Sequence, residues 1–206
     1  MALATYSDLK TTIANYLARS DLTSQITDFV TLAENRLRRE LRTRKMLKLV
    51  SASMTANDST LSLPADFLQL RDIHLASTPA QNVQYLSPSL FFRNARTTDT
   101  GVPKMYTILD AEFQFAPIPD SAYSVRMLYY ASPTYLSDSN TSNVFLANYP
   151  DALIYASLGE AEPYLMNDER LATWAAMYQR AIDAINSSDE SEEYSGVPIA
   201  MTYARS

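Results

Sequence analysis

The chain of 206 residues has no cysteine, one histidine and only three glycines. The missing cysteine excludes disulfides, thiolate metal sites and thiol nucleophiles. Because His74 stands alone, a site with several histidine ligands is excluded too. The glycines lie too far apart to build a phosphate-binding loop. We therefore expect neither a metal nor a cofactor, assign no catalytic residue, and favour a structural or binding role over an enzyme.

Long apolar runs are also missing. No stretch approaches the ~20 consecutive apolar residues that cross a bilayer, and the first residues lack the basic and apolar regions of a signal peptide. Hydrophobic residues make up 47% of the chain and charged residues 19%. This balance is typical of a folded chain with an ample core. We expect a folded protein without a membrane partner.

Charge is distributed unevenly, although the net charge is only −6. Residues 1–50 hold nine Lys/Arg against five Asp/Glu, whereas residues 151–206 hold three against ten. A basic beginning and an acidic end indicate opposed surfaces. These surfaces either pair within one monomer or pair between identical subunits, which would give a head-to-tail ring.

Two helices are predicted at the start. Thr5 and Asp8 have the spacing of a capping box, and the helix that follows should end near Arg19. Residues 21–24 offer a second cap, before a helix over about residues 24–45. Six apolar residues form one face of this second helix: Ile26, Phe29, Val30, Ala33, Leu37 and Leu41.

The middle of the chain changes to a period of two. Residues 47–51, 60–63, 67–75, 105–116 and 123–130 carry alternating, β-branched or aromatic residues. Asp110 and Ala111 have the composition of a hairpin turn. Several prolines argue against long helices here, but residues 87–94 could form a short one. We interpret residues 46–135 as a small antiparallel β domain.

Helical signals return after a polar loop that begins at residue 136. Asn148 is a good cap for a nearly all-apolar helix over residues 152–162, which should be buried; Pro163 should break or kink it. A last helix should begin at residues 167–169 and end at Ser187–Glu190. Its apolar stripe predicts a buried Trp174 beside Leu171, Tyr178 and Ile182.

The predicted fold class is α+β. Residues 1–45 and 136–188 supply the two halves of a four-helix bundle. The small antiparallel β domain, residues 46–135, is inserted between them. Residues 189–206 form an extended C-terminal arm.

A dense basic run begins near residue 36. It either binds an acidic partner or phosphate, or it is the solvated face of an amphipathic helix. We predict a subunit or partner interface there, and a nucleic-acid-binding module is the alternative function. Five residues of this run are the candidate interface residues: Arg38, Arg39, Arg42, Arg44 and Lys45.

His74 has Asp72 two residues away, on the same face if both lie on a strand. A general base oriented by a carboxylate would make the chain a hydrolase. A lone strand histidine is more often structural, and no nucleophile accompanies this one.

The end of the chain carries large apolar residues without a long periodic pattern, after an acidic run that resembles a solvated linker. A segment of this kind suits docking along a groove or sheet edge of another chain. The candidate interface residues in it are Tyr194, Val197, Pro198, Ile199, Met201 and Tyr203.

Four segments in order resemble the head-to-tail adaptors of short-tailed phages, also known as connector or tail tubular protein A-like proteins. The order of helices and β insertion is similar too, and the resemblance spans residues 20–188. The segments are Leu63–Arg71; Pro117–Tyr123 with Val125, Arg126, Tyr129 and Tyr130; Ser142–Leu146 with Tyr149–Leu153; and Glu169–Ala172 with Trp174, Tyr178 and Arg180.

The resemblance implies a virion protein at the head-to-tail junction, made in the host cytoplasm. Such adaptors form a ring of twelve subunits between the portal protein and the tail nozzle protein, and in some members they contact tail fibres. DNA leaves through the ring without being bound specifically. No enzyme activity is implied.

The first prediction concerns the arm. Proteolysis should cut residues 194–206 quickly in the free monomer, because the acidic run gives them no anchor, and slowly after assembly. Equal protection in both states would show that the segment packs on its own domain.

Overall fold

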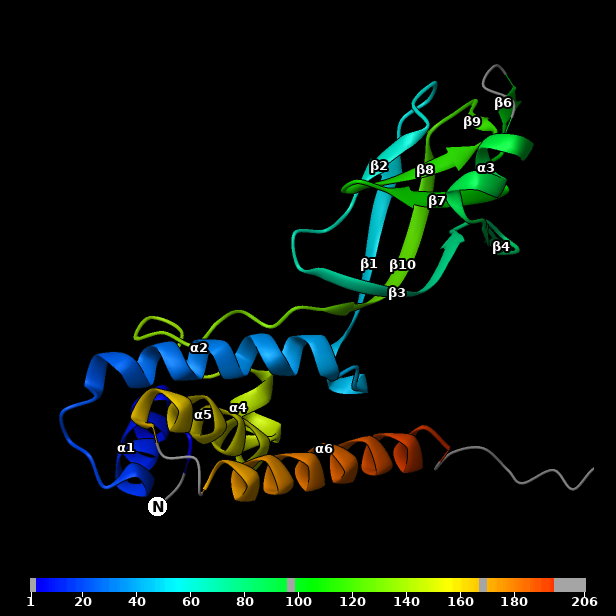
Figure 1. Ribbon diagram of the computed structural model, residues 1–206. Coiled ribbons are helices and arrows are strands. Elements are labelled where there is room, and N and C mark those ends of the chain that lie inside the picture. Colours follow the sequence, from blue (N-terminus) through cyan, green and yellow to red (C-terminus); the bar gives the residue numbers. More distant parts are fainter. Residues whose placement is uncertain (1–2, 96–98, 167–169, 195–206) are drawn as a thin grey trace, which may run out of the picture. The chain divides into compact units, whose positions relative to one another are not determined.

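The computed structural model describes residues 3–95, 99–166 and 170–194. They form two compact units: a helical unit, built from residues up to Lys45 and from Pro133 onward, and a β unit, Met46–Ser132 (Figure 1). The described residues contain six helices and mostly antiparallel strands. The mixed α+β class is therefore confirmed.

Helix α1, Tyr6–Leu17, begins at the predicted capping box. The Asp8 amide donates to Thr5 Oγ1 at 3.2 Å, and the Thr5 amide donates to Asp8 Oδ2 at 3.0 Å. These bonds satisfy two amides that a helix start leaves without partners. The Thr5 hydroxyl, which donates to Asp8 Oδ2 at 2.8 Å, and after it the Thr5 amide hold the pKa of the Asp8 carboxyl below its usual value. The helix ends at Ala18 in the left-handed region, with φ 51°.

Helix α2, Thr23–Glu40, buries the predicted apolar face, including Phe29 and Leu37. Two expectations about its ends are wrong. Its N-cap residue is Leu22, which makes no side-chain cap, and the helix stops at Glu40 rather than near residue 45. The backbone turns extended at Leu41, whose side chain is fully buried, and a short 3₁₀ turn, Arg44–Met46, leads into the first strand.

Helix α5, Pro150–Leu165, is the centre of the helical unit. It lies between α2 and α6 and also contacts α1 and the short helix α4, Val144–Asn148 (Figure 1). Its predicted burial is confirmed: Ala152, Ala156 and Ala161 are fully buried. The predicted break at Pro163 is wrong. This proline falls in the last turn, where it removes one helical hydrogen bond shortly before the helix ends.

The start of this region also differs from expectation. Asn143 rather than Asn148 is a side-chain cap: its Oδ1 accepts from the amides of Phe145 and Leu146, at 3.1 Å each, and starts α4. Asn148 ends α4, and α5 begins after Tyr149 with Pro150 in its first turn.

Helix α6 runs over Leu171–Tyr194, well past the predicted end at Ser187–Glu190. Asp189 and Glu192 stand three residues apart, so they share one helical face. Both lie beside Arg44, whose charge compensates acids near the end of a helix. The expected extended arm therefore does not begin at residue 189.

The described part of the β unit holds ten strands and α3, Pro88–Asn94, the predicted short helix. The predicted hairpin is confirmed, with Asp110 in the left-handed region between β7 and β8. The strands are β1 Leu47–Met54, β2 Thr60–Ser62, β3 Phe67–Leu75, β4 Gln81–Asn82, β5 Gln84–Tyr85, β6 Thr100–Gly101, β7 Met105–Leu109, β8 Glu112–Ala116, β9 Ile118–Pro119 and β10 Tyr123–Ala131.

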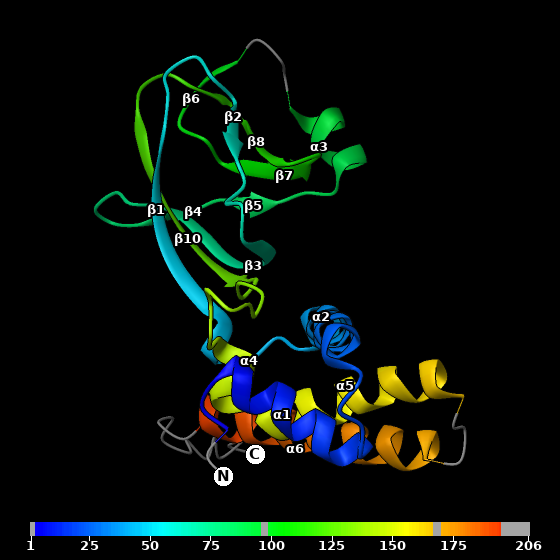
Figure 2. The same ribbon diagram turned by 90° about the vertical axis from the view of Figure 1, so that its left-hand side faces the viewer.

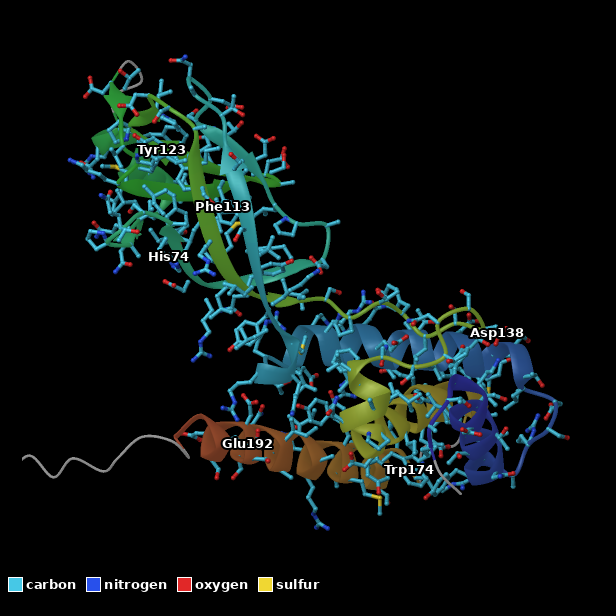
Figure 3. The ribbon with its side chains drawn as sticks, turned by 180° about the vertical axis from the view of Figure 1, so that it is seen from behind. His74, Phe113, Tyr123, Asp138, Trp174 and Glu192 are labelled. Atoms are coloured by element: carbon cyan, nitrogen blue, oxygen red, sulfur yellow. The ribbon has the colours of Figure 1, made fainter. Side chains whose placement is uncertain are left out.

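Two four-stranded sheets, β1-β10-β3-β4 and β2-β8-β7-β5, enclose the core of the β unit. Phe113, labelled in Figure 3, is fully buried there, and Phe67 and Tyr106 pack their rings against it at 5.9 Å each. The pairs β5–β7 and β6–β9 are parallel, which corrects the purely antiparallel expectation. In each pair the intervening chain forms the crossover that parallel strands require.

Trp174 is only partly buried, and Leu171 is 37% exposed, so their predicted full burial is wrong. Tyr178 and Ile182 are buried as expected. Near the start of α6 the cover consists of other aromatic rings: Tyr155 stacks on Trp174 at 6.3 Å, and Tyr16 meets it edge-on at 6.0 Å.

A polar contact fixes Trp174 in this place. Its Nε1–H donates to Glu162 Oε1 at 2.8 Å, and Glu162 is fully buried. The substitution Trp174→Phe keeps an aromatic ring but removes this hydrogen bond, so that the ion pair with Arg170 Nε, at 3.6 Å, is what remains at Glu162 Oε1. We expect it to lower the free energy of unfolding by about 1–3 kcal/mol, measured by urea denaturation followed by circular dichroism.

The exposed neighbour Thr173 gives a control. Thr173→Ala should change stability by less than about 0.5 kcal/mol. An equally small effect of Trp174→Phe would show that the bond to Glu162 contributes little.

Candidate subunit and partner interface

The basic run begins on α2 with Arg36, which makes its contacts inside the helical unit. Arg36 pairs with Glu40 at 3.1 Å and lies over the ring of Tyr178 at 4.1 Å. The Tyr178 hydroxyl donates to Glu40 Oε2 at 2.6 Å. Burial, with Glu40 as a second cause, raises the pKa of this hydroxyl well above its usual value. Tyr178 and Glu40 thus join α6 to α2.

Arg38 contacts the segment through which the chain returns from β10 to the helical unit. We name Pro133–Asn143 the connecting segment. The Arg38 guanidinium lies over the Tyr135 ring at 3.4 Å and donates to the carbonyl oxygen of Pro133. A cation on an aromatic face and a charge-assisted hydrogen bond are both favourable here, since the site is partly buried. Arg38 therefore has a role within its own chain.

Glu34, on α2, also binds the connecting segment through its side chain. Its side chain is 1% exposed, and both its oxygens accept from the Leu136 amide at 3.2 Å, while Asn143 Nδ2 donates to Oε1 at 2.6 Å. Burial raises the pKa of the Glu34 carboxyl; the bonds from Leu136 and Asn143 and the charge of Arg38 act in the opposite direction.

Arg42 and Arg44 bind backbone and side-chain oxygens at two helix ends. Arg42 Nη1 donates to the carbonyls of Arg38 and Leu41, at 2.7 and 2.6 Å. Arg44 donates from its amide to Asp189 Oδ1 at 2.8 Å, and its guanidinium reaches Glu192 Oε2 at 2.7 Å and the Glu192 carbonyl at 2.9 Å. Through Arg44, the basic beginning of the chain pairs with its acidic end within one monomer.

Arg39 and Lys45 are the candidate residues that stay exposed, and within the described part of the chain neither makes a hydrogen bond or an ion pair. Lys45 borders a hollow of about 200 Å³ that Asp189 and Glu192 also line. Figure 3 labels Glu192 near the end of α6. These two cations are the part of the predicted interface still free to meet another molecule.

Tyr194 is the last residue of α6, which places it at a helix end rather than in an extended arm. The other predicted arm residues lie outside the described part of the chain: Val197, Pro198, Ile199, Met201 and Tyr203.

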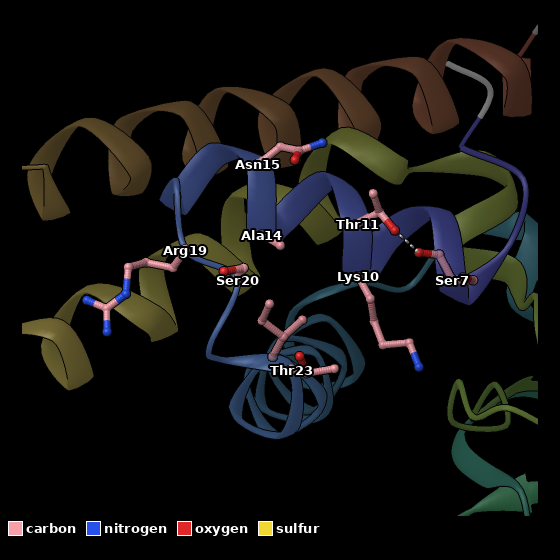
Figure 4. Close-up of a pocket in the computed structure, with 9 residues that line it drawn as sticks. Ser7, Lys10, Thr11, Ala14, Asn15, Arg19, Ser20 and Thr23 are labelled. Carbon is pink, nitrogen blue, oxygen red and sulfur yellow. Dashed lines mark hydrogen bonds between the residues drawn. The ribbon is translucent and has the colours of Figure 1, made fainter.

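A hollow of about 390 Å³ lies between α1 and the start of α2, and Figure 4 shows the residues around it. Two cations border it, but both are paired: Lys10 with Asp138 at 2.9 Å and Arg19 with Asp21 at 2.7 Å. The Arg19 guanidinium lowers the pKa of Asp21 to about 2. Neither cation is therefore free to bind an anion.

The β unit has an exposed apolar surface that the sequence interpretation missed. On α3, Leu90 is 45% and Phe92 59% exposed, while Phe91 between them is buried. Phe91 and Phe92 border a hollow of about 220 Å³ beside β8. The signal was present: three large apolar residues in a row on a seven-residue helix cannot all face one core.

His74 Nδ1 lies 3.1 Å from Asp72 Oδ2 on β3, so the two side chains meet as the spacing predicted. Asp72 is more than half exposed. The pair orients an imidazole but supplies no nucleophile, and it stays a minor alternative.

The described residues also bear on two other types of site. No helix there is long and apolar enough to span a bilayer. Nor do those residues bring three His, Asp or Glu side chains together in a way that could hold a metal ion.

A family model described as SU10 adaptor protein matches residues 4–202. The chain belongs to the SU10 adaptor protein family. This membership is consistent with a phage head-to-tail adaptor, so the family prediction made from the sequence is confirmed. No curated protein matches the chain.

As a member of this adaptor family, the chain is a phage structural protein that assembles with other virion proteins. The geometry divides its basic run accordingly. Arg36, Arg38 and Arg44 contact groups of their own chain, whereas Arg39 and Lys45 are exposed and make no hydrogen bond or ion pair within the described residues.

Glu34 gives a testable pH dependence. Its folded-state pKa lies above the ordinary value, so the folded state binds the proton more tightly than the unfolded state. Its contribution to stability is therefore present below the ordinary pKa and is lost as pH rises through the folded pKa. The free energy of unfolding of the wild type, minus that of Glu34→Gln, should fall as pH rises above about 4. Urea denaturation at several pH values measures this difference; a constant or rising difference contradicts it.

Proposed function

We propose that this chain is a structural, non-enzymatic virion protein that forms a ring at the head-to-tail junction, between portal and tail nozzle, around the DNA exit channel. The observation that carries the proposal is the family match over residues 4–202. The resemblance noted in the sequence adds an expected number of twelve subunits and the passage of DNA without specific binding. The virion is then the place where the protein acts.

The helical unit is the part that we assign to ring contacts. Its helices α1, α2, α5 and α6 act as the proposed four-helix bundle, with α5 buried at the centre. Because α2 and α6 both pack on α5 and lie on opposite sides of it (Figure 1), each presents a different outer face. A ring with head-to-tail contacts needs two such different faces on every subunit.

Exposed side chains of both charges are available for such contacts. Arg39 near the end of α2 and Lys45 beyond it are exposed cations. Asp151 of α5 and Glu190 of α6 are exposed acids that make no hydrogen bond or ion pair within the described residues. We assign contacts between the cations of one subunit and the acids of the next, with the arm residues as further contacts.

The alternative of a nucleic-acid-binding module is weakened by the contacts of the basic run. Binding to duplex DNA relies on several free Lys and Arg side chains at phosphates. Here Arg36, Arg38 and Arg44 are committed to acids, a ring and carbonyls of the same chain, and Lys48 of the β unit pairs with Asp66 at 2.7 Å. Weak, strongly salt-dependent DNA binding would be the signature of the alternative.

Charge reversal tests the ring contact. Arg39→Glu should reduce assembly at least tenfold at low salt, because it places an acid opposite acids while it disturbs no contact within the chain. Assembly is measured by native mass spectrometry and by electron-microscope class averages, on the chain alone and mixed with its portal.

Arg93→Glu is the matched control, since Arg93 is an exposed arginine at the end of α3 in the β unit. Unchanged assembly of Arg39→Glu at low salt contradicts the assigned contact. Absence of any ring from the wild type, with and without portal, contradicts the proposed function.

A further inference from the structure

Strand β1 has one edge that no other strand covers. It pairs with β10 over all eight residues, Leu47–Met54, in unbroken register. On its other side no strand of the described chain is hydrogen-bonded, because β1 ends the order β1-β10-β3-β4 (Figure 2). The other outermost strands of the two four-stranded sheets, β2, β4 and β5, have only two or three residues. β1 is thus the long open edge of the described β unit.

Most of the usual devices that protect such an edge are missing from β1. It contains no proline, no bulge and no residue at positive φ. Its one charged residue is Lys48, whose Nζ is held by Asp66 Oδ2 at 2.7 Å. Leu49 is 56% exposed. By contrast, β3 has two register shifts against β10. An open, regular edge of this length is a template for a strand from another chain.

The inner face of β1 is also incompletely buried. Met54 is buried in the core, while Val50 and Ala52, which share its face, are only partly buried although they pack against the same core. An added strand with apolar side chains on that face would complete their burial. The outer face of β1 carries the exposed Leu49 and the small polar residues Ser51 and Ser53.

The chain's own terminal segment has the matching pattern. Between residues 197 and 203 every second residue is large and apolar, and the residues between them are Pro198, Ala200 and Thr202. This alternation covers only seven residues, yet it gives one apolar face and one face of small residues. At ~3.3 Å per residue the segment would span ~23 Å, against ~26 Å for the eight residues of β1. A proline is tolerated near the start of an edge strand.

The segment also has a fixed starting point. It follows α6, whose last turns are tied to Arg44 through Asp189 and Glu192. Only Ser195 and Gly196 separate the end of α6 from Val197. Every subunit therefore presents the segment from the same place on its helical unit.

We infer that residues 197–203 of one copy pair as an added strand with the open edge of β1 in a second copy. The assignment to a second copy rests on the proposed function, because a ring brings a neighbour to every subunit. The apolar side chains of the added strand face Val50 and Ala52, and Ala200 and Thr202 face outward beside Ser51 and Ser53. Backbone hydrogen bonds supply the affinity and the alternating side chains the register.

Disulfide trapping tests this pairing cleanly, because the chain has no cysteine of its own. One full-length copy carries Ser51→Cys or Ser53→Cys, and a second copy, distinguished by a tag, carries Ala200→Cys or Thr202→Cys. Opposed residues of paired strands lie within the Cα separation that a disulfide spans. After mixing and mild oxidation we expect a linked pair of different copies in at least one combination.

The matched controls are Ile199→Cys and Met201→Cys, which sit on the other face of the added strand. We expect them to link to position 51 or 53 at least tenfold less. Equal trapping from both faces would overturn strand pairing. A chain that carries both Ser51→Cys and Thr202→Cys and closes on itself would overturn the assignment to a second copy.

Native mass spectrometry of the same samples separates this inference from the proposed function. Rings without any trapped pair would overturn the added strand but would leave the proposed ring function standing. The absence of both rings and trapped pairs would overturn both the added strand and the proposed function.

A second test uses charged substitutions in the segment. Ile199→Asp with Met201→Asp should reduce trapping between positions 51 and 202 at least tenfold, whereas Ala200→Asp alone, on the outward face, should change it less than threefold. The opposite ranking would overturn the assigned faces.

Discussion

The chain leaves and re-enters its helical unit near the end of α2, and polar side chains of this one stretch fix both passages. On the way out, Arg44 binds Asp189 and Glu192 of α6. On the way back, Arg38 and the buried carboxylate of Glu34 hold the connecting segment. Without these contacts the segments that flank the β unit would be anchored mainly by buried apolar residues such as Leu41 and Leu136. A buried carboxylate is tolerated here because donors reach both of its oxygens.

The charge pattern of the sequence therefore serves two purposes, contacts within the monomer and the proposed contacts between subunits. A basic stretch followed, far along the chain, by an acidic one first serves to close the monomer, since Arg44 meets the end of α6. Only charged side chains that are not paired within the monomer can act between subunits. The cations Arg39 and Lys45 and the acids Asp151 and Glu190 belong to this group. Composition alone could not separate the two roles, because it does not say which cations have carbonyls or rings within reach.

Much of the fold could be predicted from local pattern. The capping box of α1, the apolar stripe of α2, the all-apolar character of α5 and the hairpin at Asp110 each follow from residues close in sequence. What failed depended on distant partners. Ser187–Glu190 looks like a helix end until Arg44 is placed beside Asp189. Likewise Glu34 looks like a surface acid, and its burial is explained by donors about a hundred positions away, the Leu136 amide and Asn143 Nδ2.

Two helices of this glycine-poor chain end in a conformation that L-residues rarely adopt. Ala18 after α1 and Met166 after α5 have φ of 51° and 53°. Each costs about 1 kcal/mol or more relative to an ordinary backbone conformation, although a residue other than glycine also leaves the unfolded chain with less freedom to lose. The strain is released when the turn opens. Local unfolding of the helical unit should therefore start at these two turns, and hydrogen exchange there should be faster than in the buried centre of α5.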